Sequence, residues 1–145
     1  MFLFTPLRVI HAAIIITSAL AAPSKVEQLN ARDQPEASPS ITACTSPEFT
    51  GTCLNISVVS DACIDFASIS TFTPLDQDLS SIMIQPLGMI CTLFSQRFCA
   101  TSAAANSQDE IGLMSGDYPT LTSAIGIAGA QNFDNRARSL SCSPV

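Results

Sequence analysis

Two short polar stretches carry the residue types that could do chemistry. FDNRARSLSC, residues 133–142, places Asp134 and Asn135 shortly before Ser139. LDQDLSSI, residues 75–82, repeats this order of acidic and hydroxyl side chains. Oxygen-bearing side chains at such spacing suit a metal loop, an active site or a polar turn that binds its own backbone. These are the three alternatives that the remaining residues must separate.

The sequence lacks the bases on which most active sites depend. The only histidine is His11, in a segment expected to be removed, and no lysine follows Arg32. Ser-His-Asp and Cys-His catalysis and histidine-ligated metals are therefore excluded from the mature chain. G-x-S-x-G is also absent.

Carboxylate pairs are the other catalytic candidates. They are Asp61 with Asp65, Asp76 with Asp78, and Asp109 with Glu110. A glycosidase needs two carboxylates across a sugar-sized cleft. Asp76 and Asp78 fall in a predicted surface turn, where carboxylates are normally solvated, and a domain of this size has little room for a deep cleft. We therefore predict that the protein is not an enzyme.

The N-terminus has the composition of a secretory signal. Arg8 precedes the apolar run VIHAAIIITSALA, and Ala19 and Ala21 offer the small-x-small pattern of a cleavage site. The run is shorter than the roughly 20 residues that a membrane span requires. Residues 1–21 are predicted to be a signal peptide, and the protein to be secreted and extracellular without a membrane span.

Residues 22–40, APSKVEQLNARDQPEASPS, are polar and rich in proline and serine. They are predicted to be a disordered linker or a propeptide, with Arg32 as a candidate processing point. From Ile41 onward the sequence changes to short alternating runs punctuated by Gly, Pro, Asp and Ser, so the folded domain is predicted to occupy residues 41–145.

Six cysteines fall within this domain. They are Cys44, Cys53, Cys63, Cys91, Cys99 and Cys142. An even number in a small exported domain indicates disulfides, whereas zinc sites usually need close pairs such as C-x-x-C, which are absent. Six cysteines permit 15 pairings, and the residues alone do not choose among them.

The charge of the mature chain limits its partners. Removal of residues 1–21 leaves five basic residues against 12 acidic ones, a net charge of −7. Such a chain without a basic cluster is a poor ligand for nucleic acids or anionic membranes. An extracellular protein or cell-surface component is the expected partner.

Apolar side chains alternate at the period of β-strands. Leu54, Ile56 and Val58 share one face of CLNISVV, and the same alternation occurs in SSIMIQ, MICTLF and RSLSCSP. The stretch at residues 120–133 contains two glycines and is predicted to be a strand or an irregular segment with at most a short helical turn. The predicted class is all-β, a small two-sheet sandwich.

The domain also contains two related halves. CTSPEFTGTC and FSQRFCATSA each precede a strand, and LDQDLSSI and FDNRARSLSC each introduce a later one. The alignment pairs Phe49 with Cys99, and Ser81 with Ser139. Hairpin, long connection, polar turn and strand is the order of a Greek key.

In these features the chain resembles the βγ-crystallin superfamily, and within it small secreted cysteine-containing proteins of fungi. The resemblance implies two Greek-key motifs, with a late serine that ties down each folded hairpin. Gly51 matches the family's hairpin glycine, where a positive φ is needed. Departures are Cys44 and Cys99 at aromatic positions and Thr101 at the second glycine position.

The resemblance also implies calcium binding through paired [ND]-[ND]-x-x-[ST]-S turns. The candidate ligands are Asp76, Ser80, Asp134 and Asn135. Arg138 stands where a hydroxyl is required, and arginine offers only donors and positive charge. One site is predicted to be lost and the other to be weak. The favoured interpretation is structural: Asp134 and Ser139 hydrogen-bond their own backbone, and no cofactor is expected.

Asn55-Ile56-Ser57 is an N-glycosylation sequon with its asparagine on the polar face of a predicted strand, which makes Asn55 a candidate glycan site. The predicted function is that of a secreted, non-enzymatic binding protein of the effector or toxin-like kind, acting on another organism or its surface. One alternative is an extracellular protease inhibitor that uses residues 102–119 as a loop, although a plain connection is favoured there. The other is a structural or weakly calcium-binding wall protein.

Overall fold

The computed structural model describes residues 39–85, 87–102 and 108–145, all within the compact unit Glu36–Val145. The predicted signal peptide, and residues 22–38 of the predicted linker, lie outside the described residues and stay predictions. The first strand begins at Ser40.

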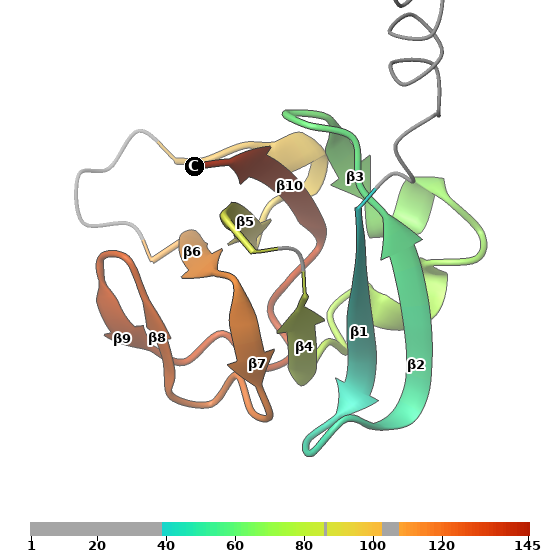
Figure 1. The fold of residues 1–145 in the computed structure, drawn as a ribbon. Coiled ribbons are helices and arrows are strands. Elements are labelled where there is room, and N and C mark those ends of the chain that lie inside the picture. Colours follow the sequence, from blue (N-terminus) through green and yellow to red (C-terminus); the bar gives the residue numbers. More distant parts are fainter. Residues whose placement is uncertain (1–38, 86, 103–107) are drawn as a thin grey trace, which may run out of the picture. The chain divides into compact units, whose positions relative to one another are not determined.

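Ten short strands and three single-turn 3₁₀ helices make up the described chain (Figure 1). They are β1 (Ser40–Ser46), β2 (Thr50–Ser57), β3 (Cys63–Asp65), η1 (Phe66–Ser68), η2 (Thr73–Leu75), β4 (Ser81–Ile84), β5 (Met89–Phe94), η3 (Arg97–Cys99), β6 (Glu110–Met114), β7 (Gly116–Tyr118), β8 (Ala124–Gly126), β9 (Gly129–Gln131) and β10 (Ser139–Pro144). The all-β class predicted from the alternating residues is confirmed.

The strands form two four-stranded antiparallel sheets with matching topologies. One sheet has the order β2-β1-β4-β7 and the other β6-β5-β10-β3. Within each repeat the first, second and fourth strands share a sheet, whereas the third strand pairs with the fourth strand of the other repeat. Two interlocked Greek keys result, as the sequence repeat predicted. The hairpin β8-β9 is an additional element in the second repeat.

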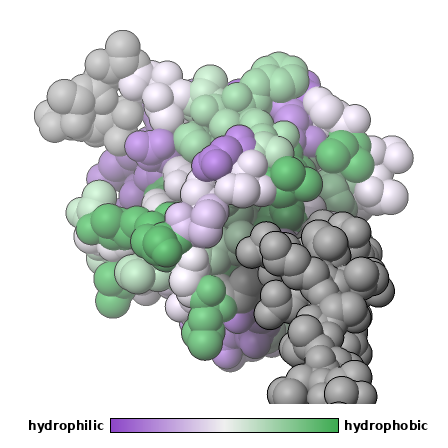
Figure 2. All heavy atoms as spheres, turned by 45° about the horizontal axis from the view of Figure 1, so that its top comes forward, coloured by the Kyte–Doolittle hydropathy of each residue, from purple (hydrophilic) through white to green (hydrophobic). Residues whose placement is uncertain are grey.

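Alternation along the strands builds one core between the sheets. Ile82 and Ile84 of the first sheet and Leu93 and Leu140 of the second are all buried. Apolar side chains from η1, η2 and the segments before β4 and β10 complete the cluster. On the face drawn in Figure 2, hydrophobic residues lie in separate groups between polar ones.

The segment predicted as a loop at residues 102–119 contains two strands. β6 pairs with β5 through Ile90↔Met114 to Phe94↔Glu110, and β7 pairs with β4. Ile111 and Leu113 are buried because E-I-G-L-M alternates at strand period. The loop interpretation, and with it the plain connection, is wrong for residues 110–118. Residues 103–107 lie outside the described part.

The hairpin β8-β9 confirms the prediction of a strand or irregular segment, rather than a helix, for residues 120–133. It lies along β6, where the Ile127 N–H donates to the Gly112 carbonyl at 2.9 Å. A Cβ added at Gly126 would lie 2.5 Å from Ile111 Cγ1. Glycine there lets the hairpin lie close against β6 and cover that sheet edge.

Candidate functional site

Each repeat folds its first hairpin over and holds it with a buried serine. Ser81 Oγ donates to the Ser46 carbonyl at 2.7 Å and accepts from the Phe49 N–H at 3.2 Å. In the second repeat, Ser139 Oγ donates to the Gln96 carbonyl at 2.7 Å and accepts from the Cys99 N–H at 2.9 Å. The role that the family resemblance implied for these two serines is confirmed.

Both folded hairpins need left-handed backbone at equivalent positions. Glu48 and Phe49 have φ values of 55° and 55°, and Phe98 and Cys99 have 59° and 53°. Gly51 has a φ of 75°, and a Cβ there would lie 2.6 Å from Thr45 Oγ1. The predicted need for glycine at this position is confirmed, and its cause is both conformational and steric.

The two polar turns lie against each other through reciprocal backbone bonds. The Gln77 N–H donates to the Ala137 carbonyl at 2.9 Å, and the Asn135 N–H donates to the Leu79 carbonyl at 3.0 Å. Gln77 and Asn135 occupy the same motif position and both have left-handed φ values, 60° and 55°. Side chains from one turn therefore meet side chains from the other.

The first meeting point collects oxygen atoms. Ser80 Oγ donates to Asn135 Oδ1 at 3.2 Å, and Asn135 Nδ2 donates to Asp134 Oδ2 at 3.3 Å. Asp134 Oδ1 is buried and has no hydrogen-bond partner within the described residues. Hydroxyl, amide and carboxylate oxygens are the ligands of a hard cation, so these three residues fit calcium in kind. They include one carboxylate, which limits the affinity such a site could reach.

The second meeting point carries a cation of its own. Arg138 Nε lies 3.4 Å from Asp76 Oδ1. A guanidinium has no acceptor atoms and its charge would repel a divalent ion. The donor set here does not fit calcium, in keeping with the argument from Arg138 in the sequence.

The expected local backbone bonds of these turns are absent from the described hydrogen bonds. The Asp134 carboxylate bonds Asn135 Nδ2, and Ser139 bonds the distant hairpin rather than its own turn. The prediction that Asp134 and Ser139 bind their own backbone is therefore wrong, because Asp134 bonds a neighbouring side chain and Ser139 bonds the folded hairpin. Calcium binding by Ser80, Asp134 and Asn135 stays a prediction.

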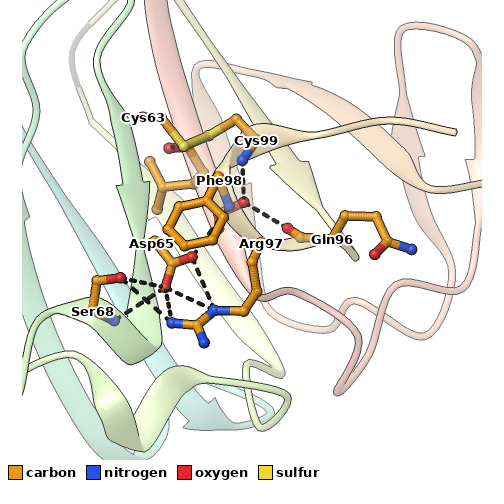
Figure 3. The surroundings of a disulfide bond; sticks show 9 residues. Cys63, Asp65, Ser68, Gln96, Arg97, Phe98 and Cys99 are labelled. Carbon is orange, nitrogen blue, oxygen red and sulfur yellow. Dashed lines mark hydrogen bonds and ion pairs between the residues drawn. A yellow bond between two sulfur atoms is a disulfide. The ribbon is translucent and has the colours of Figure 1, made fainter.

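All six cysteines form disulfides, in a pairing that the sequence left open. Cys44–Cys53 joins β1 to β2, and Cys91–Cys142 joins β5 to β10, each between residues directly opposite in register. Cys63–Cys99 joins β3 to the second folded hairpin (Figure 3). The described chain therefore presents no free thiol.

An ion pair between the buried Asp65 and the partly exposed Arg97 lies beside this third disulfide and was not predicted. Asp65 is 5% exposed, and its carboxylate accepts from Arg97 Nη2 at 2.9 Å and Arg97 Nε at 3.1 Å (Figure 3). It also accepts from the Phe98 N–H at 3.1 Å and the Ser68 N–H at 3.0 Å. The Arg97 guanidinium lowers the pKa of Asp65 to about 2, against an opposing effect of burial. Asp65 raises the pKa of Arg97 in return.

In the sequence, Asp65 stands out only as one of a candidate catalytic pair with Asp61. Nothing in the residue types linked it to Arg97, which is 32 positions away. Asp61 instead accepts bonds from Ser60 and Ser143. The structure thus separates these two acids into different roles, one structural and one at the surface.

Asn55 lies on β2 with an exposed side chain, and its Oδ1 accepts from the Thr42 hydroxyl at 2.8 Å. β2 is an edge strand, so a glycan here would extend from the border of the first sheet. Glycosylation of Asn55 stays a prediction.

The described residues contain neither a larger cluster of metal-ligating side chains nor a membrane-spanning helix. No group of three or more histidine, cysteine or acidic side chains is placed to hold a metal ion there. Across the same residues, no helix has the length and apolar character to cross a bilayer.

Comparison with known proteins shows likeness at the level of structure alone. No protein-family model matches the sequence. The curated proteins include no match either.

Several solved structures share the architecture. The N-terminal domain of Protein S superposes with a TM-score of 0.53 at 16% identity, covering 73% of this chain and 97% of that domain. A βγ-crystallin domain from Flavobacterium johnsoniae superposes with a TM-score of 0.51 at 14% identity, covering 72% of this chain and 93% of that domain. A βγ-crystallin domain from Clostridium beijerinckii superposes with a TM-score of 0.50 at 10% identity, covering 72% of this chain and 97% of that domain. Together with the interlocked Greek keys, these likenesses show that the described domain has the βγ-crystallin fold.

Proposed function

We propose that this protein is a secreted, non-enzymatic binding protein of the effector or toxin-like kind, which acts outside the cell on another organism or its surface. The predicted signal peptide supports export. Three disulfides suit an oxidising compartment, where small domains use them to supplement a limited core.

The observation that carries the proposal is how the domain uses its reactive side chains. Every cysteine is oxidised, and no histidine or lysine stands within residues 39–145. Ser81, Ser139 and Asp65 are buried and bonded to backbone groups of folded hairpins. Groups that serve elsewhere as nucleophiles, bases or metal ligands here hold the surface in shape. Contact with a partner is the function such a surface supports.

A growth assay tests the proposal. The purified oxidised protein is applied to a panel of bacteria, fungi and plant tissue, beside the same protein after reduction and alkylation. We expect inhibition or tissue damage from the oxidised form alone, because the alkylated chain cannot keep the fold. No effect of either form on any member of the panel would reject the effector role.

A structural, weakly calcium-binding role is the second candidate, favoured by one observation. Asp134 Oδ1 is buried without a partner beside Asn135 and Ser80. A weakly bound calcium ion at this point would connect the polar turns of the two repeats. Calorimetry with calcium tests it, and the absence of both heat and a shift in melting temperature would dismiss it.

The protease-inhibitor alternative loses its structural support, because β6 and β7 occupy much of the loop on which it depended. Unaffected rates across a panel of extracellular proteases would close that alternative.

A further inference from the structure

The second folded hairpin displays an apolar side chain that the fold does not require there. Phe98 is 69% exposed, although aromatic side chains usually contribute to cores. Its counterpart in the first repeat is Glu48, which is also exposed and has nearly the same φ, 55° against 59°. The fold therefore accepts a charged residue at this position, and the phenylalanine calls for another explanation.

Phe98 is held by different bonds from those of its counterpart. The N–H of Glu48 donates to the Pro119 carbonyl at 2.7 Å, whereas the N–H of Phe98 donates to the buried Asp65 carboxylate at 3.1 Å. Residues on both sides of Phe98 are also fixed. Arg97 forms the ion pair with Asp65, and Cys99 forms the disulfide with Cys63.

The ring itself is placed against a cation. Arg97 Cζ lies 5.2 Å from the centroid of the Phe98 ring, and Figure 3 shows the ring beside the Asp65–Arg97 pair. Most of the ring stays open to solvent. Side chains ordered before association lose less entropy when they bind, so a braced aromatic makes an efficient anchor. Aromatic residues and arginine are also enriched at the centres of protein interfaces.

The charges of the domain indicate what kind of surface this anchor would meet. Residues 39–145 hold three arginines against nine acidic residues. Arg97 and Arg138 are paired with Asp65 and Asp76, and Arg136 donates to the Asn132 and Gln108 carbonyls. The positive charges of the described chain are thus committed to internal bonds.

Two carboxylates are connected to the hairpin of Phe98 through the chain and its bonds. Asp61 is two residues before Cys63, whose sulfur is bonded to Cys99. Asp109 Oδ2 accepts from the Ser102 N–H, four residues after Phe98. Neither carboxylate lies within ion-pair distance of a described arginine, although the charge of Arg136 contributes to lowering the pKa of Asp109. Hydrogen bonds from Ser143 and Ser60 lower the pKa of Asp61, and those from Ser102 lower that of Asp109. Both are ionised at neutral pH.

We infer that Phe98 is the anchor of a protein-binding surface, with Asp61 and Asp109 at its rim, and that its partner is a protein presenting an apolar pocket bordered by lysine or arginine. This inference rests on the proposed binding function and adds the surface and the chemistry of the partner. Opposite charges at the rim guide association, while the buried aromatic supplies most of the affinity.

A displayed library of short random peptides tests the inference without knowledge of the natural partner. The oxidised protein is immobilised, and the selected peptides are sequenced and measured against variants. We expect the peptides to combine an aromatic or long aliphatic residue with flanking lysine or arginine. Phe98→Ala should weaken their binding by roughly 30-fold or more, the loss typical of an anchor residue. Phe98→Leu should keep much of the affinity.

Glu48→Ala is the matched control, because it truncates the equivalent side chain on the same backbone. It should change peptide binding by no more than about twofold, as exposed substitutions usually do. Asp109→Asn should weaken binding several-fold at low salt and less at high salt. Unchanged melting temperatures for all variants would show that any loss comes from the surface rather than from unfolding.

Peptides that bind Phe98→Ala as tightly as the wild type would overturn the inference. So would selected peptides without basic residues, or no selection above background. Sedimentation that shows a dimer dissociated by Phe98→Ala would assign the surface to a second copy instead. If the growth assay stays positive with Phe98→Ala, the inference fails while the proposed function stands.

Discussion

The Asp65 carboxylate accepts hydrogen bonds from two separate segments. One segment supplies the guanidinium of Arg97 and the N–H of Phe98, and the other supplies the N–H and the hydroxyl of Ser68. A buried carboxylate is costly without partners, and here five donor groups hydrogen-bond to it. The pair fixes η1 against the second folded hairpin. The charge of the Asp65 carboxylate therefore contributes more to the stability of the fold than the charge of an exposed ion pair would.

Replacing Asp65 with asparagine should destabilise the domain by about 2 kcal/mol at neutral pH, the range for hydrogen bonds to a charged group. The folded pKa of about 2 lies below the ordinary value of 3.8. The stabilisation is therefore complete above pH 3.8 and falls as the pH drops toward 2. Urea unfolding across this pH range should show wild type and Asp65→Asn converging in acid.

Asp78→Asn is the control for this experiment, since Asp78 is exposed and its side chain makes none of the described hydrogen bonds. Its stability should stay within about 0.5 kcal/mol of the wild type. A constant gap between wild type and Asp65→Asn at every pH would contradict the assigned role of the Asp65 charge.

Arg138 decides whether the second meeting point of the two polar turns, where it pairs with Asp76, can take a cation. Arg138→Ser removes the guanidinium from Asp76 and supplies a hydroxyl at the position equivalent to Ser80. We expect calcium affinity to rise above that of the wild type, measured by calorimetry, because ligand number and charge both improve. Asp78→Asn again serves as control, and equal calcium heats for wild type and Arg138→Ser would refute the explanation.

At the scale of elements, the folded hairpin between β1 and β2 depends on a close approach at Gly51. Its φ of +75° resembles that of Gly88, +74°, but only Gly51 has atoms where a Cβ would go. Gly88→Ala should cost about 1 kcal/mol from backbone conformation alone. Gly51→Ala should cost roughly 1–3 kcal/mol more, because Thr45 and Ser46 must move.

Thermal unfolding of the two glycine variants gives this comparison directly. Equal losses would mean that the hairpin does not need the close approach of Gly51 to Thr45 and Ser46.

Periodicity predicted those strands whose apolar faces are continuous. Ile82 with Ile84, and Leu140 with Cys142, gave clear alternation and are buried as expected. β6 was missed, although Ile111 and Leu113 alternate, because polar residues precede it and glycine interrupts it. β3 and β7 span three residues each, too few to show a period. Tertiary pairing rather than local sequence creates these short strands.

The features of the candidate site also fall into those that the sequence could predict and those that it could not. The serine ties and Gly51 could be predicted because the repeat places them at fixed positions. The Asp65–Arg97 pair could not, since it joins residues 32 positions apart with no shared motif. The disulfide pairing also needed the structure, because strand exchange between the repeats brings Cys63 of the first to Cys99 of the second.

At the scale of the whole molecule, the disulfides close loops of different length. The paired cysteines are 9, 36 and 51 residues apart. In the chain-entropy description, a longer closed loop restricts the unfolded chain more. The pair Cys91–Cys142 connects strands at the start and end of the second repeat, so it should stabilise the domain most.

Replacing both Cys91 and Cys142 with alanine should therefore cost about 4 kcal/mol, against about 3 kcal/mol for the same change at Cys44 and Cys53. Guanidinium unfolding of the two double variants measures the difference. The reverse order would show that native contacts, rather than loop closure, dominate the effect of these bridges.

The most direct test of this account is peptide mapping, under non-reducing conditions, of the protein recovered from the medium of cells that express the full chain. The account predicts three links, Cys44 to Cys53, Cys63 to Cys99 and Cys91 to Cys142, in a protein that has left the cell. Free thiols, a different pairing or a protein retained inside the cell would contradict the oxidised, secreted double Greek key on which the proposed function rests.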